Sequence, residues 1–172
     1  MATTGMILAQ MLALQLAQVS PPPAPEGCAA TSPLTSEYEG WYAMQGVSAG
    51  TGIAAPATLA LGRSVRATLV PVARVTFPAA VARSVDAGGM GGVFAVDVDK
   101  PGVYRLAEDS IAWIDMVAGD KLLTAVAHGH GPECSGIRKY VDFRLTAPGR
   151  YLVQVAGSKV AGIALMVSRV GD

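Results

Sequence analysis

The chain has 172 residues, of which 51% are hydrophobic and 15% are charged, and its mean hydropathy is +0.40. This length and composition favour one globular domain with a sizeable core. Thirteen Lys and Arg balance thirteen Asp and Glu, and no basic run is longer than Arg138-Lys139. The sequence therefore lacks the basic surface that nucleic acid or an anionic lipid surface requires.

The N-terminal segment carries no charge before Glu26. Its apolar stretch, Met6 to Val19, is shorter than the roughly 20 residues that a transmembrane helix needs. It predicts the apolar region of an export signal rather than a stable transmembrane span, with an amphipathic or core helix as the alternative. We expect a periplasmic or secreted protein with a signal-like segment over 1–20, a Pro-rich linker and N-terminal arm over 21–40, and one β-sandwich domain over 41–172.

Cys28 and Cys134 are the only two cysteines. In an exported chain this pair predicts one disulfide, which ties the start of the mature chain to the segment that holds both histidines. A lipid anchor on Cys28 is the alternative. The preceding Pro25-Glu26-Gly27 disfavours it, because lipidated cysteines follow small apolar residues.

From Gly92 onward, short apolar runs alternate with turns. We expect strands over 93–99, 103–106, 111–117, 122–128, 140–145, 151–155 and 163–170, with Gly119-Asp120 as a two-residue hairpin turn. The range 60–75 predicts one or two strands that Pro71 confines to a sheet edge, and 84–92 predicts a flexible loop. Strand signals at this spacing, without an amphipathic helix, indicate an all-β fold, an antiparallel β-sandwich or jelly roll.

Both histidines lie close together, in His128-Gly-His130-Gly-Pro-Glu133. Residues two apart on a strand share a face, so His128 and His130 with Glu133 form a candidate site for a divalent metal, Zn²⁺ or Cu²⁺. Cupins also place His-x-His before a Glu, but with a longer spacing and a further His that this chain lacks. We favour a structural role, in which the histidines bond to neighbouring backbone or carboxylate groups and Gly129 and Gly131 permit close approach of the backbone.

A candidate ligand site comprises Trp113, Asp115 and Arg138. Trp113 and Asp115 share one strand face, and an aromatic ring beside a carboxylate suits sugars or cations. If Asp115 is buried it needs a partner, for which Arg138 and Lys139 are the candidates. The alternative is an Asp on the solvated face of a half-exposed sheet.

Two resemblances follow from these motifs. Lys100-Pro101-Gly102-Val103-Tyr104 and the run from Ala147 to Val155 are similar to bacterial pre-peptidase C-terminal-type β-sandwich domains, in which such turns open strands. The blocks 112–115 and 126–139 resemble a group of small exported alphaproteobacterial proteins of unassigned function. Some members of that group carry an automatic label of homogentisate 1,2-dioxygenase, which implies an iron site with more histidines than the two present here.

None of Ser110, Ser135, Ser158 and Ser168 lies in a Gly-x-Ser-x-Gly elbow, so these serines give no support to nucleophilic catalysis. We therefore expect a non-catalytic binding or accessory module of the cell envelope, whose partner is a protein or a small-molecule ligand. The sequence assigns it no cofactor other than the candidate divalent metal, Zn²⁺ or Cu²⁺. The alternative is a small, cupin-like metal-binding protein that uses His128, His130 and Glu133. The automatic family label would make that alternative a metal-dependent oxygenase.

Overall fold

The computed structural model describes residues 25–81 and 88–172; the predicted signal-like segment lies outside them. In these residues no helix is long and apolar enough to cross a membrane. The 3-10 helices are η1 (Ser36–Tyr38) and η2 (Val72–Arg74). The strands are β1 (Gln45–Ser48), β2 (Ala57–Leu59), β3 (Ser64–Thr68), β4 (Val70–Pro71), β5 (Met90–Val98), β6 (Gly102–Glu108), β7 (Trp113–Ala118), β8 (Lys121–Leu122), β9 (Ala125–Gly129), β10 (Lys139–Leu145), β11 (Gly149–Ser158) and β12 (Gly162–Gly171).

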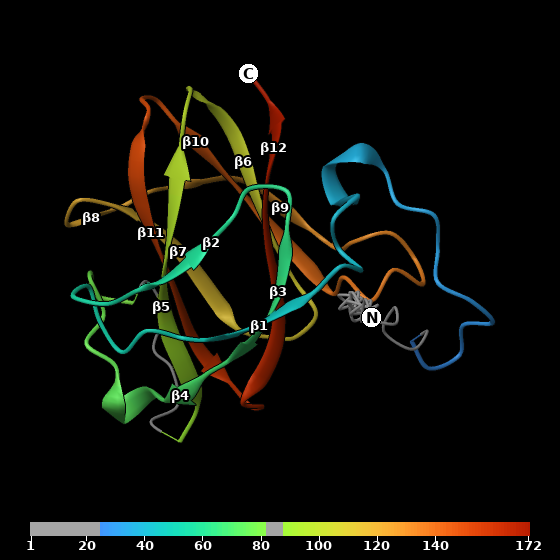
Figure 1. Cartoon of the computed structure of the whole chain (residues 1–172), viewed down its shortest axis with the longest axis horizontal. Coiled ribbons are helices and arrows are strands. Elements are labelled where there is room, and N and C mark those ends of the chain that lie inside the picture. Colours follow the sequence, from blue (N-terminus) through green and yellow to red (C-terminus); the bar gives the residue numbers. More distant parts are fainter. Residues whose placement is uncertain (1–24, 82–87) are drawn as a thin grey trace, which may run out of the picture.

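The strands form two sheets that pack face to face (Figure 1), which confirms the predicted all-β sandwich. The first sheet has the order β1-β3-β12-β6-β10-β9, and the second has the order β2-β5-β11-β7-β8 with β4 paired to β5. Most neighbouring strands are antiparallel, but β1 pairs with β3 and β2 pairs with β5 in parallel. The sheets are therefore mixed rather than purely antiparallel.

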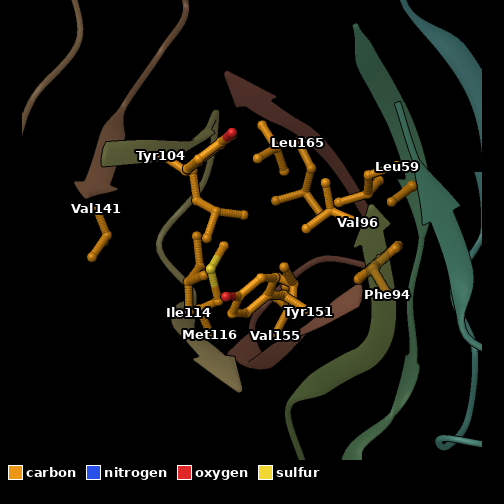
Figure 2. Packing of buried hydrophobic residues seen from close by; sticks show 14 of the residues in the cluster. Leu59, Phe94, Val96, Tyr104, Ile114, Met116, Val141, Tyr151, Val155 and Leu165 are labelled. Carbon is orange, nitrogen blue, oxygen red and sulfur yellow. The ribbon is translucent and has the colours of Figure 1, made fainter. Parts of the chain in front are cut away.

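Alternate residues of the long strands build the core between the sheets. Tyr104 and Leu165 of the first sheet face Phe94, Val96 and Tyr151 of the second (Figure 2), and all five are at most 7% exposed. Because side chains alternate between the two faces of a strand, three alternate residues from each of β5, β10, β11 and β12 enter this cluster. Burial of apolar surface at this scale is the main stabilising contribution to the sandwich.

The two Pro-Gly-x-Tyr motifs adopt the same local structure. Gly102 and Gly149 open β6 and β11 with φ of +155° and +150°, at the limit of the region that favours glycine. Two residues later, the hydroxyl of Tyr104 donates to the carbonyl of Lys100 and that of Tyr151 donates to the carbonyl of Ala147, each at 2.8 Å. Each buried ring is thereby fixed to the turn that precedes its strand.

The predicted hairpin over 111–128 is wrong in its second half. Gly119, with φ of +63°, makes the expected turn, but β8 pairs with β7 over two residues only. After the Leu123 N–H donates to the Met116 carbonyl at 2.8 Å, the chain crosses to the first sheet, where β9 pairs with β10. An alternating pattern shows which residues face the core but not which sheet they join. The sequence therefore could not distinguish a continued hairpin with β7 from a crossing to the first sheet.

Two other expectations also need correction. Within 60–75, β3 lies between β1 and β12 rather than at an edge, because Pro71 belongs to the separate two-residue strand β4. The loop predicted over 84–92 lies partly outside the described residues, and its last part, from Met90, is the start of β5. Gly92 is required there by packing, since a Cβ at this position would lie 2.3 Å from the Ala49 Cβ.

The N-terminal arm, residues 25–44, covers the outer face of the first sheet and lies beside the loop that precedes β10 (Figure 1). A second buried cluster forms there from Tyr38, Trp41, Ala107, Ile137, Ala164 and Met166. The predicted disulfide between Cys28 and Cys134 is present, with its Cα atoms 5.7 Å apart. The Trp41 indole donates to the Ser135 carbonyl at 3.1 Å, so a hydrogen bond as well as the disulfide joins the arm to the loop.

Candidate functional site

A cavity of about 440 Å³ lies where the chain crosses from β8 to β9. Its walls come from both sheets: β7 and β8 on one side, and β9 and β10 on the other. Ile114 and Val141, on the left of the core cluster in Figure 2, are among its lining residues. The apolar aliphatic and phenyl side chains on the walls are Ile114, Leu122, Leu123, Ala125, Val141 and Phe143.

Trp113 and Asp115, two of the three predicted ligand-site residues, line this cavity. The Trp113 indole donates to Asp115 Oδ1 at 2.8 Å, and the Gln154 amide of the neighbouring strand donates to Oδ2 at 2.9 Å. Asp115 is 6% exposed and Gln154 is 1% exposed. The interpretation of Asp115 as a solvated residue is therefore wrong, and the hydrogen-bond donors that hold its carboxylate include Trp113 and Gln154.

Lys139, the other suggested partner of Asp115, pairs with Glu108 instead. The two residues are cross-strand neighbours on β10 and β6, and Lys139 Nζ lies 3.1 Å from Glu108 Oε1. The same ammonium donates to the Ala112 carbonyl and lies 6.0 Å from the centre of the Trp113 ring. Lys139 thus connects the first sheet to the start of β7 while its side chain lines the cavity.

Glu108 is a completely buried carboxylate behind this wall. Its Oε1 accepts the Ala112 N–H at 3.2 Å, whereas among the described residues Oε2 has no hydrogen-bond partner. Burial raises the pKa of Glu108 above its usual value, and the charge and hydrogen bond of Lys139 oppose that rise. The Glu108–Lys139 pair therefore places two compensating charges beside an apolar cavity.

Arg138, the third predicted ligand-site residue, does not join the other two. It is exposed and lines a separate groove with Ile111 and Lys159. Its backbone N–H donates to the Glu108 carbonyl at 2.8 Å. The strand pattern places Trp113 and Asp115 on one face but does not predict that Leu123 lines the cavity, because that position depends on the crossing from β8 to β9. It does not predict the role of Glu108 either, because the contact with Lys139 depends on the pairing of β6 with β10.

The segment from His128 to Gly131 is held mainly by contacts with the neighbouring strand and loop. His128 is opposite Val141 on β10 and lines the cavity, whereas His130 Nδ1 bonds to the Arg138 carbonyl at 2.9 Å. A Cβ on Gly129 would lie 2.8 Å from the Tyr140 hydroxyl, and one on Gly131 would lie 2.3 Å from the Ile137 Cβ. Gly131 is therefore required by close packing, and Gly129 allows the close approach of the Tyr140 side chain, as the structural interpretation predicts.

No group of three or more His, Cys, Asp or Glu side chains within 25–81 and 88–172 is arranged to hold a metal ion. Metal binding by His128, His130 and Glu133 stays a prediction from the sequence. Calorimetric titration of Zn²⁺ or Cu²⁺ into the protein tests it directly.

No family model matches this chain, and no curated protein matches it.

Proposed function

We propose that this protein is a non-catalytic binding module that holds a small, largely apolar ligand in the cavity between its sheets. The observation that carries the proposal is the cavity itself, because its volume of about 440 Å³ falls within the roughly 300–1,000 Å³ of typical ligand pockets. Such pockets are mostly apolar with a few placed polar groups, and here the polar residues His128 and Lys139 line the cavity together with the apolar ones.

The polar groups on the walls favour binding over turnover. The Asp115 carboxylate accepts hydrogen bonds from Trp113 and Gln154, and the Lys139 ammonium forms an ion pair with Glu108. Side chains held in this way are fixed in position. Fixed walls bind a ligand without a large entropic cost.

The experiment is a fluorescence titration with N-phenyl-1-naphthylamine, an uncharged apolar probe whose emission rises in an apolar site. Ala125 is exposed and lines the cavity, so Ala125→Trp should fill the entrance and weaken probe binding by at least about tenfold, a loss of about 1.4 kcal/mol. Ala127→Trp is the matched control and should leave probe affinity unchanged, because Ala127 is also exposed on β9 but is not among the cavity-lining residues. Equal affinity in the parent protein and the Ala125→Trp variant, or no binding by the parent, would contradict the proposal.

We further propose that the protein works in the periplasm or outside the cell. The Cys28–Cys134 disulfide supports this location, because disulfides persist in oxidising compartments. The apolar segment before Pro21 and the resemblance to small exported proteins support it as well. N-terminal sequencing of protein from its native host should find a mature end between about residues 18 and 26; Met1 retained in a cytoplasmic fraction would contradict export.

A further inference from the structure

We infer that the ligand of the inter-sheet cavity carries an uncharged hydrogen-bond acceptor, such as an amide, ester or ketone oxygen. This oxygen accepts a hydrogen bond from the Lys139 ammonium. This inference rests on the proposed binding function and specifies the chemistry of the ligand. It follows from the donors of Lys139, from its access to the cavity and from the charge of Glu108.

Among the described residues, Lys139 has more N–H donors than oxygen acceptors. An ammonium group has three N–H donors, and the oxygen atoms that Lys139 contacts there belong to Glu108 and Ala112, while the centre of the Trp113 ring lies 6.0 Å away. The Lys139 side chain is 27% exposed and lines the cavity. A ligand oxygen inside the cavity can therefore accept the remaining hydrogen bond.

The charge of this acceptor is limited by Glu108. The Glu108 side chain is 0% exposed, and Lys139 provides the compensating positive charge 3.1 Å away. An anionic ligand would place a second negative charge on the same ammonium, next to a carboxylate whose Oε2 has no partner among the described residues. Repulsion between like charges is strong in such an environment, so an uncharged acceptor is favoured over a carboxylate.

The apolar walls define the rest of the ligand. Leu122, Leu123, Val141 and Phe143 line the cavity together with Trp113, so most of the ligand contacts apolar residues. The ligand class is therefore a small aliphatic or aromatic body with an uncharged oxygen-bearing group.

Octanamide and octanoate test this chemistry, because they share one apolar chain and differ in charge. Each is used to displace N-phenyl-1-naphthylamine from the full protein at pH 7.5. We expect octanamide to compete at a concentration at least about tenfold lower than octanoate. Equal or better competition by octanoate would overturn the inference while leaving the binding function intact, whereas failure of the probe itself to bind would overturn both.

A double variant, Glu108→Gln with Lys139→Met, tests the role of Lys139. Removing both charges avoids leaving Glu108 buried without its partner, and the introduced amide keeps an acceptor for the Ala112 N–H. Octanamide should bind about 10-fold to 100-fold more weakly, whereas N-phenyl-1-naphthylamine, which needs no charged donor, should bind within about twofold of the parent value. Unchanged octanamide affinity would overturn the inference.

If the double variant does not fold, infrared spectroscopy of the parent protein with carbonyl-labelled octanamide tests whether the ligand carbonyl accepts this hydrogen bond. A hydrogen bond from an ammonium lowers the carbonyl stretching frequency relative to the amide in a solvent without donors. If the carbonyl stretch of bound octanamide has the same frequency as that of octanamide in a solvent without donors, the inference is overturned.

Discussion

Glu108 occupies the most unusual electrostatic position among the described residues of this protein. It is completely buried, its Oε1 carries the ion pair and a backbone hydrogen bond, and its Oε2 carries neither. Burial raises the pKa of Glu108 despite the nearby Lys139. The folded protein therefore binds a proton at this residue more tightly than the unfolded chain does.

This raised pKa determines how stability should depend on pH. The contribution of Glu108 to the free energy of unfolding is fully present below its unfolded pKa and is lost as pH rises through the higher folded pKa. We expect the stability of the parent relative to Glu108→Gln to be greatest in acid and to decline as pH rises through that interval. Denaturant unfolding of both proteins from pH 4 to pH 8 measures this difference.

The exposed residue Glu39 provides the control for this titration. Glu39→Gln removes the same carboxylate charge from the surface, so its stability difference from the parent should change less over the same pH range. A parent-to-Glu108→Gln difference that instead grows with pH would show that the folded pKa is depressed and would contradict the structure.

Single residues were predictable where the strand pattern alone decides their position. The common face of Trp113 and Asp115 follows from their spacing, and both line the cavity. The hydrogen bond from Gln154 to Asp115 joins two residues separated by 39 positions. The sequence could not show this contact, because it depends on how β11 pairs with β7.

At the scale of elements, the disulfide joins the N-terminal arm to the loop before β10. Its cysteines are separated by 106 positions, so in the chain-entropy model it stabilises the fold by about 4–5 kcal/mol through the unfolded chain. We expect the Cys28→Ala, Cys134→Ala double variant to lose about that free energy of unfolding. The buried cluster around Trp41 and Met166 should hold the arm in place without it.

Denaturant unfolding with circular dichroism tests both parts of this prediction. The strand signal of the variant should match that of the parent in the absence of denaturant, and the reduced parent should unfold at the same denaturant concentration as the variant. A loss below about 1 kcal/mol would contradict the stabilising role of the disulfide.

The elements themselves show what a local pattern can and cannot predict. Turn residues and alternation placed the seven strands expected after Gly92 close to β5–β7 and β9–β12. They could not show that Leu122 ends one strand pairing and Ala125 begins another in the opposite sheet. Strand order depends on contacts between distant segments, and β1 and β2 are too short to carry a clear pattern of their own.

At the scale of the whole molecule, the cavity is a product of that crossing. β8 ends after two residues on the second sheet, and β9 forms the edge of the first. The connecting residues Leu123 and Thr124 lie on the cavity wall between the two sheets. The central claim is that this space holds a ligand.

The most direct test is a set of intermolecular nuclear Overhauser effects between N-phenyl-1-naphthylamine and methyl-labelled protein. The account predicts effects from the aromatic protons of the probe to the methyl groups of Leu123 and Val141, which line the cavity. Ile53 and Val160 are 64% and 52% exposed and are not among the cavity-lining residues, so they report adsorption to the surface. Effects confined to Ile53 and Val160, with none to Leu123 or Val141, would contradict the account.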